Sequence, residues 1–264
     1  MEQNTFSLAV CNQAGVTLAQ SSGTTQTVLL YDAPYCPGDA IVFTPDCAGY
    51  YVITLEDTLG EEFVYLNGQS FRWEIPFDEG RISYNPRAFE GVRHYIAARR
   101  ATPAEIAFPR NLARNVYDCH GNTACFPHAM ANVETRNESV FAARNAIDGV
   151  IYPHCHGRYP FQSWGINRRP DAEWHLDFGR PVRAETLVLT TRADFPHDAW
   201  WTQATLILSD GTRRILALQK TAEGQSFDLG GTIIDGLTLC ELIKADDPSP
   251  FPALTQVEVF GENI

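Results

Sequence analysis

Residues 145–149, with the sequence NAIDG, decide the fold of the second half of this chain when they are read together with later stretches. Residues 162–164 read QSW, residues 174–179 read WHLDFG, and residues 253–261, ALTQVEVFG, close the chain. Gly149 lets the first stretch bend tightly, because glycine adopts backbone conformations that other residues avoid. The order and spacing of these stretches indicate the fold, which no one of them would indicate alone.

The composition indicates a globular protein with one large or two modest domains. The chain has 264 residues, 44% of them hydrophobic, which is enough to bury a sizeable core. A formal net charge of −12 argues against nucleic acid as a partner, because phosphate binding requires clustered Lys and Arg. No apolar run reaches the length of a membrane span, and residues 1–4 are too polar to begin a signal peptide. We therefore expect a soluble, cytoplasmic protein that binds neither nucleic acid nor membrane.

The first hundred residues predict a strand-rich domain. Apolar and β-branched runs occur at residues 6–10, 27–31, 41–44, 50–55, 62–66 and 71–75, with a further strand at 95–98. Asn67-Gly68 predicts a hairpin between two of these runs, because both residues tolerate positive φ. Pro103 and Pro109 are expected to limit helix in the connection that follows. We predict a β-sandwich over residues 1–105 and an ordered connecting segment over 106–127.

The strand pattern resumes over residues 128–264. Alternating or apolar runs occur at residues 186–191, 204–208, 215–218, 226–229 and 237–239, and a tight turn is expected at 209–211. The predicted fold is all-β, with two tandem β-sandwich (jelly-roll) domains.

The ordered set of motifs resembles the discoidin-type, or galactose-binding-like, β-sandwich of many carbohydrate-binding modules. This resemblance covers roughly the C-terminal half and implies recognition of a sugar. It also implies a structural calcium held by the loop around Asp148, since carboxylate oxygens suit that cation. Gln256 stands where the family has a glutamate near the calcium, and its amide oxygen would be a weaker ligand. The alternative is that Asp148 only caps a turn.

Ligands in this family meet loops at one end of the sandwich, and three polar loops are candidates here: residues 134–138, 154–169 and 192–201. A sugar requires a flat apolar face and planar hydrogen-bonding groups. The face is expected from Trp164, Trp200 and Trp201, although one of two adjacent tryptophans is usually core and Trp164 matches a structural position. The expected polar groups are His156, Arg158, Asn167, Arg192, Asp194, His197 and Asp198.

Catalysis and zinc binding are left open by the residues. Glu134, Asp194 and Asp198 could supply a carboxylate pair for glycoside hydrolysis, and His197 could serve as the base of a lyase. The absence of nucleotide and phosphate-loop motifs argues against redox and nucleotide chemistry. Zinc is a lesser alternative, for which two sets of ligands occur. They are His154 with His156, and Cys119 and His120 with Cys125 and His128. Otherwise the seven cysteines are expected to be small buried side chains.

The function predicted from the sequence is a soluble carbohydrate-binding protein that takes a mono- or oligosaccharide. One alternative is an enzyme, a glycoside hydrolase or lyase, that acts on imported oligosaccharides. Another is a structural or assembly protein whose aromatic loops make contacts between copies in a homo-oligomer.

Overall fold

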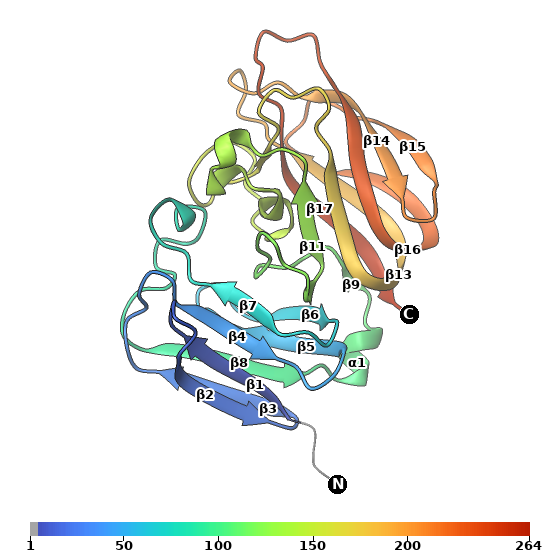
Figure 1. The fold of residues 1–264 in the computed structure, drawn as a ribbon. Helices are drawn as coiled ribbons and strands as arrows, with labels where there is room; N and C mark the ends of the chain where they lie inside the picture. Colours follow the sequence, from blue (N-terminus) through green and yellow to red (C-terminus); the bar gives the residue numbers. More distant parts are fainter. Residues whose placement is uncertain (1–4) are drawn as a thin grey trace.

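The computed structural model describes residues 5–264, and its secondary structure is almost entirely β (Figure 1). The N-terminal part has two antiparallel sheets, ordered β2-β1-β4-β7 and β10-β6-β5-β8-β3. Their strands are β1 (Phe6–Cys11), β2 (Thr17–Gly23), β3 (Gln26–Tyr31), β4 (Ala40–Thr44), β5 (Gly49–Thr54), β6 (Glu62–Leu66), β7 (Phe71–Glu74), β8 (His94–Arg100) and β10 (Cys125–Phe126). The all-β fold class with antiparallel sheets is therefore confirmed.

Several strands of this part bury alternate side chains, whereas β5 buries four in a row. In β3 and β7 buried and exposed residues alternate strictly, so that one face of each sheet forms a core containing Phe6, Phe43, Tyr51 and Trp73. Strand β2 was not predicted, and it has no buried residue. An edge strand without a buried face gives no alternation in the sequence.

The predicted hairpin at Asn67-Gly68 is wrong. Strand β6 pairs with β5 and β10, whereas β7 pairs with β4 in the other sheet. The Asn67 amide group donates to Thr123 O at 2.8 Å, and the Asn67 backbone N–H donates to Ala124 O at 3.1 Å. These bonds fix the residue against the chain that enters β10, and Asn67-Gly68 becomes a corner between the two sheets.

The connecting segment, residues 106–127, forms strand pairs with both parts of the molecule. Helix α1 (Pro103–Ala107) begins with a capping box between Thr102 and Glu105, and Pro103 occupies its first turn. The expectation that Pro103 limits helix is therefore wrong, because proline is well tolerated where the N–H has no helical partner. Strand β9 (Arg110–Asn111) pairs with a C-terminal strand, and β10 pairs with β6. Within residues 5–264, no helix is both long and apolar enough to cross a membrane.

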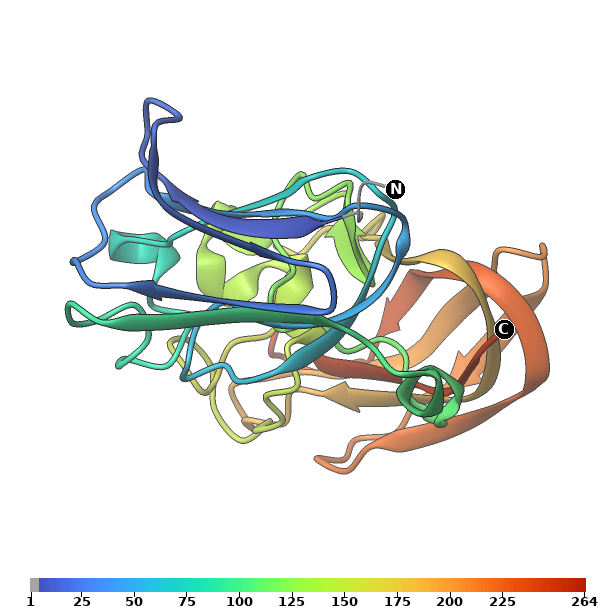
Figure 2. The same ribbon diagram turned by 90° about the horizontal axis from the view of Figure 1, so that it is seen from below.

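The C-terminal part is an eight-stranded antiparallel sheet that curls around a second core (Figure 2). Strands β13 (Trp174–Thr191) and β16 (Gln225–Lys244) are long, and their register shifts between Asp177 and Val182. Such irregularities bend a sheet, and they explain why β16 was predicted as two separate strands. The other strands are β9, which pairs with β17, and β11 (His128–Ala131), β12 (Trp164–Gly165), β14 (Trp201–Leu208), β15 (Arg213–Ala217) and β17 (Ala253–Asn263).

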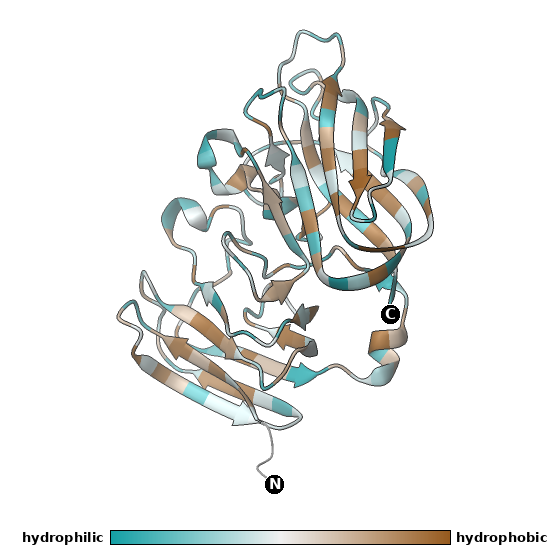
Figure 3. Ribbon diagram, turned by 45° about the vertical axis from the view of Figure 1, so that its right-hand side comes forward, coloured by the Kyte–Doolittle hydropathy of each residue, from teal (hydrophilic) through white to brown (hydrophobic). Residues whose placement is uncertain are grey.

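Hydrophobic and hydrophilic residues alternate along the strands of both parts (Figure 3). Two separate cores result, one between the N-terminal sheets and one inside the curled C-terminal sheet. Leu112 joins the C-terminal core and Tyr117 the N-terminal one, so residues 106–127 contribute to both. The division into domains at residues 105 and 128 stays a prediction.

Candidate functional site

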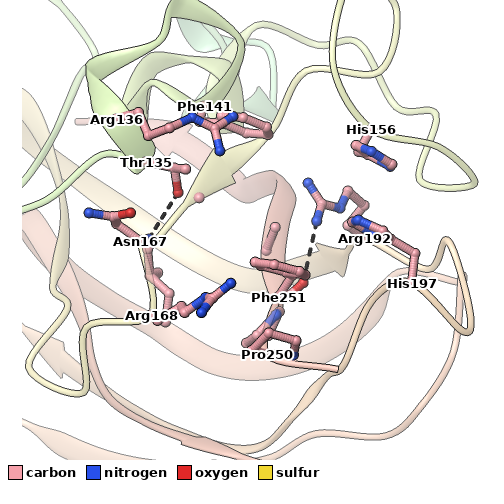
Figure 4. A pocket seen from close by; sticks show the side chains of 14 residues that line it. Thr135, Arg136, Phe141, His156, Asn167, Arg168, Arg192, His197, Pro250 and Phe251 are labelled. Carbon is pink, nitrogen blue, oxygen red and sulfur yellow. Dashed lines mark hydrogen bonds between the residues drawn. The ribbon is translucent and has the colours of Figure 1, made fainter. Parts of the chain in front are cut away.

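A cavity of about 380 Å³ lies where loops from the C-terminal part converge (Figure 4). Strand β13 ends at Thr191 and β17 begins at Ala253, and the Arg192 N–H donates to Ala253 O at 2.9 Å. This bond holds the loop after β13 beside the loop before β17. The cavity is lined by Thr135, Arg136, Phe141, His156, Gly165, Ile166, Asn167, Arg168, Arg192, His197, Pro250, Phe251, Pro252 and Ala253.

The Arg192 side chain is buried and forms the floor of the cavity. Its Nε lies 2.9 Å from both carboxylate oxygens of Asp198, and the two side chains are 5% and 0% exposed. Asp198 also accepts the Asp194 backbone N–H at 2.9 Å. Because a buried charge is tolerated only when it is paired and hydrogen-bonded, this ion pair holds residues 192–198 in one conformation.

A column of planar side chains forms one wall. The rings of His156 and His197 are stacked with centroids 4.0 Å apart and planes 6° apart. The His197 ring is stacked on Phe251 at 5.3 Å, and the Arg168 guanidinium lies 4.7 Å from the centroid of the Phe251 ring. His156 Nδ1 lies 2.8 Å from a carboxylate oxygen of Asp194, which orients the outermost ring. The wall therefore combines flat surfaces with nitrogen atoms at their edges.

The opposite wall comes from the short 3₁₀ helices η2 (Thr135–Asn137) and η3 (Ser139–Phe141) and from the turn after β12. The Asn167 N–H donates to Thr135 Oγ1 at 2.9 Å, which links the two. Arg136, Asn167 and Arg168 have φ values of 53°, 49° and 61°. Residues other than glycine adopt such angles rarely, and they do so in tight turns and at some functional sites.

The lining is cationic although the whole chain is acidic. It contains three arginines and two histidines, and it contains no carboxylate. Arg192 is paired with Asp198, and Arg136 Nε is paired with Glu138 at 2.6 Å. Arg168 forms no salt bridge within residues 5–264. The cavity thus offers many hydrogen-bond donors and one guanidinium whose charge is not balanced by a partner.

The structure brings together four of the predicted ligand-binding residues: His156, Asn167, Arg192 and His197. Asp194 and Asp198 lie behind the wall and hold it in place. Arg158 is exposed and does not line the cavity.

Two of the three tryptophans that were expected to form the flat face are buried. Trp164 and Trp201 are 0% and 2% exposed, and both belong to the C-terminal core, so neither ring can meet a sugar. Trp200 does not line the cavity, and it packs against Phe195 and Lys220. The aromatic residues that do line it, Phe141 and Phe251, were missed. The signal for Phe251 was a lone aromatic residue within a proline-rich loop, residues 248–252, just before the last strand.

None of the candidate catalytic carboxylates reaches the cavity. Glu134 accepts the Ala143 N–H at 2.7 Å and lies 2.8 Å from His120 Nε2. Asp198 is held by Arg192, and Asp194 faces His156. His197 is the one catalytic candidate on the cavity surface, and the nearest carboxylate, Asp198, is buried behind it. The predicted carboxylate pair for glycoside hydrolysis is therefore not assembled in this cavity.

Asp148 and Gln256, the calcium ligands that the resemblance implied, differ in their hydrogen bonds to the rest of the protein. Both carboxylate oxygens of Asp148 accept protein donors, Gln162 Nε2 at 2.7 Å and the Val150 N–H at 2.8 Å. Burial raises the pKa of Asp148 to about 6. Gln256 is fully buried, and neither the nitrogen nor the oxygen of its side-chain amide has a hydrogen-bond partner within residues 5–264. The Asp148 carboxylate is satisfied within its own turn and requires no cation. The Gln256 amide has no partner, and its oxygen is a suitable ligand for one. A bound calcium ion stays a prediction.

The second set of predicted zinc ligands does not converge. His128 Nδ1 lies 2.7 Å from an oxygen of Asp118, while His120 pairs with Glu134. Cys125 is buried and Cys119 largely so, and burial raises the pKa of the Cys119 thiol to about 12. Neither of the metal-type clusters found within residues 5–264 includes any of these four side chains.

No family model matches this sequence, and no curated protein matches it. Among solved structures, a fucose-binding module of Streptococcus pneumoniae has 16% identity and a TM-score of 0.43, over 58% of this chain and 99% of its own. The family 32 carbohydrate-binding module of C. perfringens NanJ, in complex with galactose, has 13% identity and a TM-score of 0.38, over 50% and 91%. The lectin domain of lectinolysin, complexed with Lewis B antigen, has 17% identity and a TM-score of 0.42, over 58% and 98%.

These neighbours are carbohydrate-binding modules, as the discoidin-type resemblance implied, and the resemblance is confirmed to that extent. Each of them matches at most 58% of this chain. Their TM-scores are below 0.5, so the likeness by itself identifies neither a ligand nor the residues that would hold it.

Proposed function

We propose that this chain is a carbohydrate-binding protein and that the sugar occupies the cavity between η2, the turn after β12, and the loops beside β13 and β17. The observation that carries the proposal is the composition of the lining: three arginines and two histidines, with no carboxylate, around flat ring surfaces. The cavity volume of about 380 Å³ lies at the lower end of the range of about 300–1,000 Å³ for small-ligand sites.

Each part of the lining supplies something that a sugar requires. Hydroxyl and ring oxygens accept hydrogen bonds, and a guanidinium presents its N–H groups in a rigid fork that can meet two adjacent oxygens. Arg168 is the best placed for this because no carboxylate occupies its donors. The imidazole surface of His156, at the end of the stacked column, suits the C–H face of a sugar ring.

The alternatives have less support. A glycoside hydrolase requires two carboxyl groups that flank the bond to be cleaved, about 5–9.5 Å apart, and the cavity lining has none. The assembly hypothesis required tryptophans that are free to pack against a second chain. Trp201 is already only 2% exposed within its own chain, which leaves Trp200 as the one remaining tryptophan of the two candidates.

Calorimetric titration with a panel of neutral and acidic sugars, including galactose, fucose and galacturonate, tests the proposal. Each mixture is analysed afterwards for cleaved product. At least one sugar is expected to bind and to remain intact. Arg168→Ala should weaken that binding about tenfold or more, because hydrogen bonds from charged donors are the strong ones. Arg158→Ala, which removes an exposed arginine outside the cavity, should bind as the wild type does.

Three results would overturn the proposal. They are silence across the panel, equal weakening by Arg158→Ala, and conversion of the sugar to product. The last would instead establish an enzyme.

A further inference from the structure

A cluster of metal-type ligands lies at the edge of the cavity, and the sugar site does not account for it. Ligand atoms of Cys155, His156 and Asp194 all lie within 4.8 Å of one another. Ligand atoms of Asp194, His197 and Asp198 meet the same condition. Asp194 is common to both groups, and the rings of His156 and His197 are stacked 4.0 Å apart. Cys155, His156, Asp194 and His197 do not meet the condition as one group, and two parallel stacked imidazole rings cannot direct nitrogen lone pairs at the same ion. The group of Cys155, His156 and Asp194 is therefore the candidate for a single ion.

Asp198 is the least suitable of these ligands. Its carboxylate is fully buried and accepts hydrogen bonds from the Arg192 guanidinium and from the Asp194 N–H. A cation at Asp198 would also lie beside the positive charge of Arg192. Asp198 lies 3.1 Å from His197 Nδ1 and orients that ring, which in turn stacks on the ring of His156.

We propose that Cys155, His156 and Asp194 form a binding site for one transition-metal ion of the zinc class. A thiolate, an imidazole and a carboxylate form the mixed sulfur, nitrogen and oxygen set that zinc accepts, and water takes the fourth tetrahedral position. Bond lengths of about 2.0–2.3 Å place tetrahedral ligand atoms roughly 3.3–3.8 Å apart. His156 Nδ1 and the Asp194 oxygen are 2.8 Å apart, so the ion replaces the proton between them with a movement of less than about 1 Å.

The two loops that carry these ligands are held together independently of any ion. The Ala193 N–H donates to Pro153 O at 2.8 Å, which ties the loop of Cys155 and His156 to the loop of Asp194 and His197. The Arg192–Asp198 pair then fixes the second loop from beneath. Preorganised ligands of this kind lower the cost of assembling a metal site.

The site is open to solvent. The side chains of His156 and Asp194 are 39% and 29% exposed, so an ion can enter from one side. His156 also lines the cavity, and a bound ion therefore fixes that ring, which stacks on His197. Metal binding does not depend on the sugar proposal, because it requires none of the cavity arginines.

Zinc titration of the chelator-treated full chain tests this inference, with bound metal measured per chain. The expected result is one zinc ion per chain. The expected signature with cobalt in place of zinc is a sulfur-to-cobalt charge-transfer absorption. His156→Ala and Cys155→Ser should each weaken zinc binding at least about tenfold, and Cys155→Ser should remove the charge-transfer band. His154→Ala and Cys36→Ser are the matched controls, because neither side chain is part of the cluster. Both should bind as the wild type does.

Thermal melting of each variant without metal checks that it folds, and Asp194→Asn serves as a third variant if either of the first two does not. Absence of zinc uptake overturns the inference, and so does uptake that the cluster variants leave unchanged. Loss through Cys119→Ser alone places the metal elsewhere and also overturns it. Sugar titration of the metal-free protein separates the two proposals: sugar binding without zinc uptake refutes only the metal site, and zinc uptake without sugar binding refutes only the sugar site.

Discussion

Planar side chains gather in two regions of this molecule, inside the N-terminal sandwich and at the loops of the C-terminal sheet. Trp73 is 1% exposed and packs edge-on against Tyr117, with ring centroids 5.2 Å apart. Phe251 is 36% exposed and lies between the His197 ring and the Arg168 guanidinium. The first group consists of aromatic rings that are buried away from water. The second group also includes a guanidinium and an imidazole ring, and it lies beside a cavity.

The difference follows from where each group lies along the chain. Trp73 belongs to β7, in which buried and exposed residues alternate, so its direction is set by the pleat of the strand. Arg168 and Phe251 lie in connections beyond the strand ends, where no pleat directs side chains inward. Aromatic content alone therefore does not identify a binding site. The useful signal is an aromatic or planar polar residue in a loop that the sheet brings beside another such loop.

Trp73→Ala should produce the largest effect and act on the fold only. A buried tryptophan replaced by alanine leaves a cavity and costs about 4–5 kcal/mol in the free energy of unfolding. Urea denaturation measures this loss, and the sugar affinity of the folded variant should equal that of the wild type. Phe251→Ala should show the reverse, with weakened affinity and a stability change within about 1 kcal/mol. Loss of affinity in folded Trp73→Ala would remove the distinction between the two regions.

Asp198→Ala should affect both properties, because the Arg192–Asp198 pair supports the cavity from within the fold. Removing one partner leaves Arg192 buried without a carboxylate, at a cost of about 3–4 kcal/mol in unfolding free energy. Sugar affinity should fall as well, since residues 192–198 lose their anchor. The control is Glu138→Ala, which breaks an exposed pair whose side chains are 64% and 39% exposed and costs less than about 1 kcal/mol. Equal losses in the two variants would contradict a supporting role for the buried pair.

Glu62, a buried carboxyl group in the N-terminal region, should make the free energy of unfolding depend on pH. Burial raises the pKa of Glu62 to about 7, although Arg114 and two backbone N–H groups lower it in part. Folding therefore favours the protonated carboxyl. Its stabilising contribution is complete below pH 4.5, the ordinary pKa of this group, and is lost as the pH rises through 7. The expected loss is about 2–3 kcal/mol.

Urea denaturation in steps from below pH 4.5 to above pH 7 measures this dependence. Glu62→Gln should flatten that part of the profile, because the amide does not titrate. Its sugar affinity should equal that of the wild type, since Glu62 is outside the cavity. A wild-type profile that rises with pH over this range would show that the folded state favours the ionised carboxylate instead.

Most strands could be predicted from the sequence because one face of each is buried. The run at residues 62–66 matches β6, and that at 41–44 matches β4 to within one residue. Strand β2 was missed since it buries no residue. The partners of β6 and β7 were also wrong, because Asn67-Gly68 favours a turn but does not specify which strands lie beside it. Pairing between sheets depends on contacts distant in the sequence.

The candidate site could be predicted only in part, for similar reasons. The loops of His156 and Arg192 were recognised by their density of polar groups. Phe251 was missed because the prolines around it indicate only a break in structure. The assignment of Trp201 to the ligand failed since a single sequence does not tell which of two adjacent tryptophans faces the core. That choice is set by the register of β14 against β16, which begins with Trp201 opposite Lys244.

The smallest expected effect is a difference in affinity between acidic and neutral sugars at the C-terminal cavity. Arg168 has no ionic partner within the described residues, so a sugar that carries a carboxylate should bind more tightly than its neutral counterpart. We expect galacturonate to exceed galactose about fivefold, which corresponds to about 1 kcal/mol. The advantage should shrink as salt is added, because the site is open to solvent and exposed charges are screened. Arg168→Gln keeps hydrogen-bond donors but should abolish the difference, while Arg158→Gln should retain it. If both sugars bind equally at low salt, the guanidinium acts only as a donor of hydrogen bonds, and the charge of the cavity does not select its ligand.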